Sequence, residues 1–290
     1  MSKNRRLDQI NQRANDLGLP KQYFQKLYFI ECFLDNISNS SYKDDFILKS
    51  GFELQSLLGV THRMTEDLDT TLNRHDLNPD NVIKVLTDIC LVSQNSDVQF
   101  SIRSLKPEMD ENRYPGLRAT IAVKMGEVKN SFKLDISTGD LIIPEPIKLN
   151  YHGSLNDTKP FQVWAFPPTQ IIADKLTALV KFGRINSRAK DLFDFYALKN
   201  SDFGKVNALD LLEAYQGKSQ NIGLTTAISD IPKQVELLRS SVGLQKSWTN
   251  YQRRRPYASE ISFDDTLSAA ASYANMLDIA NKKVVSNQKK

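Results

Sequence analysis

The segment RMTEDLDTTL, residues 63–72, holds two aspartates separated by a single leucine, Asp67 and Asp69. If this segment is a strand, its side chains alternate between two faces, so Arg63, Thr65 and Thr71 share a face with both aspartates. Neighbouring carboxylates repel each other unless a cation lies between them. Mg²⁺ commonly takes one or two carboxylates together with substrate phosphates. The pattern therefore favours a divalent-metal site, and its alternative is a solvated acidic strand end.

A third carboxylate lies in the segment SFKLDIS, which alternates apolar and polar residues as a half-buried strand does. Phe132, Leu134 and Ile136 point one way, so Asp135 lies on the polar face. Together with Asp67 and Asp69 it could hold one or two Mg²⁺ ions. Such sites clamp the attacking and leaving oxygens in phosphoryl or nucleotidyl transfer.

Ser50 and Gly51 form a small-residue turn between the apolar run Phe46–Leu48 and a segment with helical spacing. Backbone N–H groups at the start of a helix can bind a triphosphate. The sequence thus predicts a phosphate-binding turn here. The alternative is an ordinary connection between a strand and a helix.

Two charged residues fall on apolar arcs of predicted helices. Lys175 lies between Phe182 and Leu179 on a helical wheel of residues 171–182, where it needs a partner or a polar cleft. Its alternative is snorkelling, with the ammonium group in water. Asp191 lies on a similar arc in SRAKDLFDFYAL, where the alternative is a first-turn aspartate paired with Arg188.

The elements that must position these residues follow from hydrophobic periodicity. Helices are predicted at 21–37, 79–93, 170–182, 188–199, 205–215 and 264–281. Strands are predicted at 46–48, 63–72, 98–104, 118–126 and 130–137, the last two forming an antiparallel hairpin. The fold class is therefore α+β: strands and helices in residues 1–165, then a helical domain in residues 166–290.

Composition is that of an ordinary globular protein, with 40% hydrophobic and 25% charged residues. No apolar run reaches the length of a membrane span, and the basic N-terminus lacks the apolar region of a secretory signal. Cys32 and Cys90 stand alone, which signals neither a disulfide framework nor a zinc site. We therefore expect a cytoplasmic protein without a membrane partner.

Charge is distributed unevenly along the chain, whose formal net charge is +4. Residues 1–30 carry six Lys and Arg against two Asp, and residues 233–290 carry ten against five acids. The middle of the chain is consequently acidic. Basic ends around an acidic middle suit a metal-dependent site that also holds a polyanion, although solubility alone would also explain them.

Five segments, in this order, resemble the AbiEii-type nucleotidyltransferase toxins, the toxin half of type IV (abortive-infection) toxin–antitoxin systems. They are FILKSGFEL, RMTEDLDTTL, FKLDIS, PPTQIIADKLTAL and SRAKDLFDFYAL, and they span residues 20–200. The resemblance implies a polymerase-beta-like nucleotidyltransferase, with a mixed sheet and flanking helices followed by a helical domain. It also implies Mg²⁺ as cofactor, an NTP substrate and a cognate antitoxin. Some family members transfer nucleotides to the 3′ end of tRNA, so an RNA acceptor is expected.

The resemblance also implies roles for single residues. Asp67 and Asp69 would be catalytic metal ligands, and Asp135 a third metal-binding carboxylate. Ser50 and Gly51, with Thr65, would bind the nucleotide. Lys175 would contact the nucleotide in catalysis, and Asp191 would be a catalytic or site-organising acid. Family members usually carry Gly-Gly or Gly-Ser where this chain has Ser50-Gly51, and serine adopts a positive φ less cheaply than glycine.

Two other functions stay open at this stage: a catalytically idle module that binds nucleotide or RNA, and a nucleotidyltransferase that modifies a protein or a small molecule. The segment KSWTNYQRRRPY, residues 246–257, interleaves aromatic and basic residues and could bind single-stranded RNA. The alternative for this segment is a loop whose aromatic side chains pack on the C-terminal domain.

Overall fold

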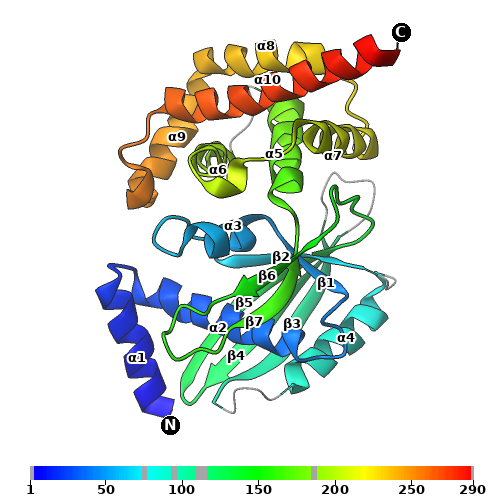
Figure 1. Ribbon diagram of the computed structural model, residues 1–290. Coiled ribbons are helices and arrows are strands. Elements are labelled where there is room, and N and C mark those ends of the chain that lie inside the picture. The colour runs from blue at the N-terminus through cyan, green and yellow to red at the C-terminus, as the bar shows by residue number, and fades with distance from the viewer. Residues whose placement is uncertain (1–2, 74–76, 93–96, 109–115, 184–187, 289–290) are drawn as a thin grey trace. The chain divides into compact units, whose positions relative to one another are not determined.

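The computed structural model describes residues 3–73, 77–92, 97–108, 116–183 and 188–288 (Figure 1). The chain divides into two compact units. Unit 1 contains residues 1–140 and 146–166, and unit 2 contains residues 141–145 and 167–290. No helix among these described residues is long and apolar enough to cross a membrane.

Unit 1 is built on a mixed seven-stranded sheet with the strand order β3-β4-β5-β2-β1-β7-β6. The strands pair antiparallel except for two parallel pairs, β2 with β5 and β1 with β7. Their bounds are β1 Phe46–Lys49, β2 Asp67–Leu72, β3 Gln99–Glu108, β4 Gly116–Met125, β5 Val128–Ser137, β6 Ile147–Tyr151 and β7 Phe161–Ala165. The mixed sheet with flanking helices confirms the predicted fold class.

The hairpin of β4 and β5 is also confirmed. Met125 pairs with Val128, so two residues make the turn, and Gly126 has φ = 60°. Two-residue hairpin turns need a positive φ at their first central position, which glycine adopts without steric cost. The hairpin places Asp135 on β5 beside Arg118 on β4.

One face of the sheet is covered by helices α2 (Lys21–Ser38) and α4 (Pro79–Leu91), as Figure 1 shows. The ring of Phe33 on α2 lies 5.3 Å from that of Phe100 and 5.4 Å from that of Phe132. Because side chains alternate along a strand, Asp135 on β5 must point to the opposite face. Asp69, its register partner on β2, points the same way.

The remaining helices of unit 1 are α1 (Lys3–Asp16), which packs on α2, and α3 (Ser50–Leu58), which follows β1. Helix α1 and strands β6 and β7 are not among the sequence-based predictions. The predicted strand at 63–72 begins only at Asp67, so Arg63 and Thr65 precede the strand, contrary to the prediction.

Unit 2 is helical. Its helices are α5 (Pro168–Phe182), α6 (Ala189–Lys199), α7 (Ala208–Asn221), α8 (Ile231–Leu237), α9 (Val242–Arg254) and α10 (Phe263–Gln288). The long helix α10 packs against α6, α7 and α8 with buried residues such as Leu267 and Tyr273. The segment 141–145 joins this unit through the Ile143 N–H, which donates to Gln170 Oε1 at 2.9 Å. The chain therefore enters unit 2 at residues 141–145, returns to unit 1, and enters unit 2 again at Pro167.

Candidate active site

The turn at Ser50 and Gly51 connects β1 to α3. Ser50 has φ = 63°, and it is the one non-glycine residue with a positive φ in the part of the chain that the structure describes. This left-handed conformation is costly for a residue with a Cβ atom, and such strain concentrates at functional sites. The turn leaves the first N–H groups of α3 at the start of the helix, where an anion can bind.

Gly51 is in close contact with the segment that precedes β2. A Cβ atom at Gly51 would lie 3.0 Å from Thr65 Oγ1 and 3.2 Å from a guanidinium nitrogen of Arg63. Residues with side chains therefore fit poorly at this position. Arg63 and Thr65 reach the Ser50-Gly51 turn from an irregular segment, and not from the strand face predicted for them.

A buried glutamine explains why residues 63–66 do not continue the strand. Gln55 Oε1 accepts a hydrogen bond from the Thr65 N–H at 2.8 Å and another from the Tyr23 hydroxyl at 2.5 Å. Arg63 is buried and donates to the Met64 carbonyl. Side chains thus satisfy backbone groups that would otherwise seek a strand partner. Sequence analysis missed Gln55, although a fully buried glutamine always needs such partners.

Asp67 and Asp69 lie at the start of β2, on the face opposite α2. Asp67 is exposed, and Asp69 is partly buried. In the sheet register Asp69 lies between Lys49 of β1 and Asp135 of β5. Directly paired residues share a face, so one cation and two carboxylates lie side by side across three strands.

Asp135 is already engaged by Arg118. Arg118 Nε donates to Asp135 Oδ1 at 2.6 Å, and its Nη2 donates to Oδ2 at 2.7 Å. Such a bidentate pair holds both carboxylate oxygens. Among the described residues, no group of three or more His, Cys, Asp and Glu is placed to hold a metal ion. Asp67 and Asp69 still fit a metal that takes its other oxygen ligands from a substrate, while Asp135 would first have to leave Arg118.

Lys49, the register partner of Asp69, belongs to a network of polar side chains. Lys49 Nζ donates to Ser137 Oγ at 2.7 Å and to Asp140 Oδ2 at 3.0 Å. Asp140 Oδ2 also accepts from the hydroxyls of Ser137 and Thr71. This polar network continues the face that carries Asp69, and sequence analysis did not single out Lys49 or Asp140.

Within unit 2, Lys175 is buried and ion-paired. Its Nζ lies 2.9 Å from Asp191 Oδ1 and 2.6 Å from Asp194 Oδ2, and the three side chains are 7%, 2% and 0% exposed. Lys175 has therefore found the partner that its apolar arc requires, and snorkelling is excluded. Asp191 also pairs with Arg188, whose Nε lies 2.7 Å from Oδ2. This contact is an ion pair without the geometry of a hydrogen bond.

Comparison of the sequence with known protein families identifies its family. The sequence model of the family described as nucleotidyl transferase AbiEii toxin, type IV TA system, matches residues 32–269. The chain belongs to the AbiEii family. Members of this family are nucleotidyltransferases, so the chain is an enzyme of this class. No curated protein matches it.

Two solved structures from Helicobacter pylori share the fold of this AbiEii protein. The protein JHP933 is 16% identical with a TM-score of 0.55, and the match covers 93% of this chain and 98% of that chain. A structure described as a candidate nucleotidyltransferase is also 16% identical, with a TM-score of 0.54, covering 92% of this chain and 99% of that one. At this identity the likeness shows the fold alone.

The basic and aromatic segment 246–257 of the AbiEii chain is mostly helix α9, and its aromatic side chains pack inside unit 2. Trp248 is 1% exposed and stacks on Tyr251, with ring centroids 5.6 Å apart. Tyr257 packs against Phe193 at 4.9 Å. The packing alternative is therefore confirmed for the aromatic residues, whereas Arg253 and Arg254 are exposed.

Proposed function

We propose that this AbiEii protein transfers a nucleotidyl group from an NTP to an RNA acceptor, with a divalent metal ion, Mg²⁺, held by Asp67 and Asp69. One observation carries the proposal: the strained turn at Ser50-Gly51 contacts Thr65, two residues before Asp67. An anion-binding turn and a pair of hard oxygen ligands thus belong to one short stretch of structure. That combination suits a metal-bound triphosphate.

Each residue has a distinct part in this proposal. The N–H groups at the start of α3 bind the phosphates, and Thr65 is held against Gly51 by the Gln55 hydrogen bond, so that its hydroxyl lies beside them. Asp67 and Asp69 would hold the metal, which when bound neutralises charge on the transferring phosphoryl group. Lys49 lies next to Asp69 in the register and offsets the repulsion between carboxylates there.

Lys175 and Asp191 remain proposed nucleotide-site residues, and the structure shows the contacts they make. Two carboxylates position the Lys175 ammonium group, so a nucleotide phosphate would compete with them for it. The acceptor, RNA such as the 3′ end of tRNA, and a cognate antitoxin are proposed from the family and from the uneven charge of the chain.

The test is nucleotidyl transfer by Asp67→Asn and Asp69→Asn variants. Each labelled NTP is incubated with total RNA, Mg²⁺ and the wild type or a variant. We expect the wild type to label RNA. Each variant should transfer nucleotide at least about 100-fold more slowly, because a metal ligand is removed. Asp8→Asn, at an exposed position on α1, is the matched control and should keep full activity.

Stability is measured in parallel, because removing one of two neighbouring carboxylates should leave the metal-free protein as stable as the wild type or more stable. Transfer at the wild-type rate by either variant, with Mg²⁺ as the only divalent ion, would refute the metal assignment. Labelling of protein in place of RNA would refute the assignment of RNA as the acceptor.

A further inference from the structure

Three neighbouring strands of unit 1, β3, β4 and β5, carry basic side chains on one face of the sheet. The register places Lys106 of β3 beside Arg118 of β4, and Arg118 beside Asp135 of β5. Lys124 of β4 lies beside Lys129 of β5. Because register partners and every second residue of a strand share a face, all five lie on the face opposite α2. The basic face comprises Lys106, Arg118, Lys124, Lys129 and Lys133.

The lysines of the basic face have no counter-charges. Lys106, Lys124, Lys129 and Lys133 are exposed, and they form no ion pair with any residue that the structure describes. Arg118 is paired with Asp135. On β3, β4 and β5, Asp135 is the one acid of this face whose side chain the structure describes. The positive charge of these strands is therefore in excess, which favours an anionic ligand.

Two pairs of like charges face each other across these strands. Lys106 is directly opposite Arg118, and Lys124 is directly opposite Lys129. Directly opposed residues of an antiparallel pair have Cβ atoms about 4.5–5.5 Å apart, and like charges at that distance are destabilising. A face that only had to be soluble gains more from opposite charges at such positions. The two pairs thus indicate an anion that lies over both, by the reasoning that assigns a cation to two neighbouring carboxylates.

The basic face is continuous with the proposed metal ligands. Lys133 is the register partner of Asp67, and Asp135 is the register partner of Asp69. The row that begins at Thr120 of β4 therefore runs through Lys133 to Asp67. An extended anion bound along β4 and β5 would end beside the residues proposed to hold the metal. That location suits the acceptor of the proposed reaction.

The other side chains of the basic face indicate which part of an RNA fits it. On this side β3, β4 and β5 otherwise carry small or polar side chains and no aromatic ring, in the part that the structure describes: Gln99, Ser101, Ser104, Thr120, Ala122, Ser131 and Ser137. The rings of Phe100 and Phe132 lie on the other side, against Phe33 of α2. Single strands are usually bound by aromatic rings that stack on bases, whereas a duplex offers phosphates and 2′-hydroxyls. Lysines with serine and threonine hydroxyls match a duplex.

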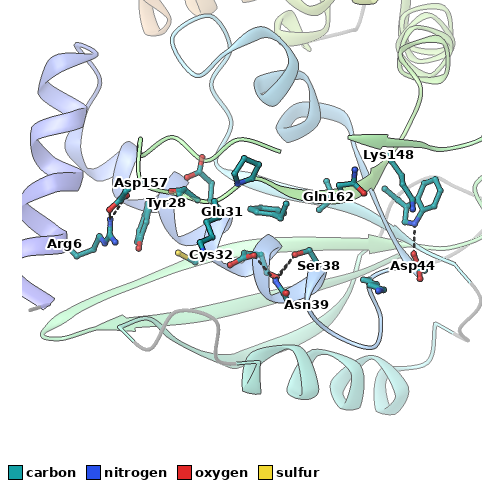
Figure 2. Close-up of a pocket in the computed structure, with 18 residues that line it drawn as sticks. Arg6, Tyr28, Glu31, Cys32, Ser38, Asn39, Asp44, Lys148, Asp157 and Gln162 are labelled. Carbon is teal, nitrogen blue, oxygen red and sulfur yellow. Dashed lines mark hydrogen bonds and ion pairs between the residues drawn. The ribbon is translucent and has the colours of Figure 1, made fainter. Parts of the chain in front are cut away.

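The cavity of unit 1 drawn in Figure 2, of about 890 Å³, differs from the basic face in charge. Its wall carries four acidic and four basic side chains: Glu31, Asp35, Asp44, Asp157, Arg6, Lys43, Lys148 and Lys159. Arg6 and Asp157 are paired with each other at 2.7 Å. The charges of the cavity wall balance, so charge does not favour an anion there as it does on the basic face.

We propose that the basic face docks a base-paired segment of the acceptor RNA, next to the end that receives the nucleotide. The inference rests on the proposed function, since it gives that RNA a contact surface beside Asp67 and Asp69. Arg118 and Lys124 are about 20 Å apart along β4, at about 3.4 Å per residue. This length is about half a turn of a nucleic-acid duplex, whose full turn is about 34–36 Å. The lysines bind its phosphates, so binding depends on salt and little on the base sequence of the stem.

The test is the variant Lys106→Gln, Lys124→Gln, Lys129→Gln and Lys133→Gln, which removes four charges and leaves Arg118 to hold Asp135. Affinity is measured, without NTP or divalent metal, for an RNA hairpin with a stem of about eight base pairs and a 3′ overhang of about four nucleotides. An oligouridylate of the same length is measured in parallel. The hairpin should bind the variant at least about tenfold more weakly at about 0.1 M salt. The slope of log K against log salt should fall by about 3–4, at about 0.9 per lost phosphate contact, and the oligouridylate should lose less affinity.

The matched control replaces four exposed lysines of unit 1 outside the basic face by glutamine: Lys21, Lys43, Lys84 and Lys159. Unchanged hairpin affinity in the face variant would overturn the inference, as would the same loss in the control or an equal loss for the oligouridylate. Loss of binding to phosphatidylserine vesicles with unchanged hairpin affinity would assign the face to a membrane surface and overturn it too.

The result is independent of nucleotidyl transfer, because binding is measured without it. A hairpin that binds the wild type and the control more tightly than the face variant supports docking even where the wild type labels no RNA. Thermal unfolding checks the fold. The face variant should be at least as stable as the wild type, because two pairs of opposed like charges are removed.

Discussion

Ser50 has a backbone conformation that favours glycine. Its φ of 63° places the Cβ atom close to the following carbonyl, at a cost of roughly 1–2 kcal/mol. The neighbouring Gly51 has no room for a side chain, because Thr65 and Arg63 lie against it. The turn is therefore held in this conformation by its surroundings.

We predict that Ser50→Gly stabilises the protein. Glycine removes the steric cost at this φ but adds roughly 0.4–1 kcal/mol of unfolded-chain entropy, so the net gain is about 0.5–1 kcal/mol. Urea unfolding of wild type and variant measures it. As control, Ser50→Ala should not stabilise, because alanine keeps the Cβ atom. A less stable Ser50→Gly variant would show that the serine hydroxyl outweighs the backbone strain.

At the scale of the elements, helices α5 and α6 are joined by a buried charge cluster. Lys175 on α5 contacts both Asp191 and Asp194 on α6, and Asp194 has no exposed surface. The sequence alone suggests that Lys175→Met keeps stability and lowers activity. The contacts reverse the first half of that expectation, because the methionine would leave two buried carboxylates facing each other.

We predict that Lys175→Met destabilises the protein by about 3–5 kcal/mol, the usual cost of removing one partner of a buried ion pair. In the double variant Lys175→Met and Asp194→Asn, one charge of each sign is lost and Asp191 keeps Arg188. The double variant should therefore recover about 2 kcal/mol of that loss. Chemical unfolding of the two single variants and the double variant tests the coupling. Purely additive effects would mean that Asp194 does not stabilise the lysine.

A second link between elements lies in unit 1, where Glu31 of α2 holds residues 151–154. Burial raises the pKa of Glu31 to about 7, although its hydrogen bonds from Ser154 and Tyr151 oppose the shift. The folded protein thus binds this proton more tightly than the unfolded chain does. Its contribution to stability is full below pH 4.5 and is lost as the pH rises to about 7.

We predict that Glu31→Gln removes this component of the pH dependence. In the wild type, the free energy of unfolding should fall by about 3 kcal/mol between pH 4.5 and about 7, because the pKa of Glu31 rises from 4.5 to about 7 on folding. Tyr151 does not interfere, because burial raises its pKa well above 10. Urea unfolding at pH 5 and pH 8 gives the comparison, with Glu127→Gln at the exposed hairpin turn as control. The same pH dependence in Glu31→Gln and wild type would contradict the assignment.

Periodicity predicted the elements that have one strongly apolar face. Helix α2, helix α4 and the β4–β5 hairpin follow from their patterns, and so do the α5 and α6 positions of Lys175 and Asp191. Strand β6 gives a weaker pattern because most of its side chains are exposed at the sheet edge. A helical wheel shows that Lys175 needs a partner but not which one, so Asp194 emerges only from the packing of α5 on α6.

The structure of residues 63–66 was not predictable for a related reason. The spacing of Arg63, Thr65, Asp67 and Asp69 is that of a strand, and half of the segment is one. Gln55, eight residues before Arg63 in the chain, prevents the strand from starting earlier. Its side chain accepts a hydrogen bond from the Thr65 N–H, which is then not available to a neighbouring strand. A hydrogen bond to a single side-chain amide leaves no periodic signal in the sequence.

At the scale of the whole molecule, positive charge is concentrated at the two ends of the chain, in different units. The first basic region consists of α1 and the start of α2, in unit 1. The second includes Arg253, Arg254 and Arg255 at the end of α9, where the neighbouring aromatic rings are used for packing. The arginines alone are thus left to contact a polyanion.

We predict that replacing these three arginines by alanine weakens RNA binding through phosphate contacts alone. The slope of log K against log salt should fall by about 2, and the affinity for an NTP should change little. RNA affinity at several salt concentrations, for the wild type and the triple arginine variant, measures this.

The matched control for the arginines replaces Lys190, Lys233 and Lys283, three exposed lysines of unit 2, by alanine. An equal slope change in that control would mean that RNA responds to net charge and not to a particular segment. A slope that stays parallel to the wild type in the arginine variant would remove residues 253–255 from the acceptor site.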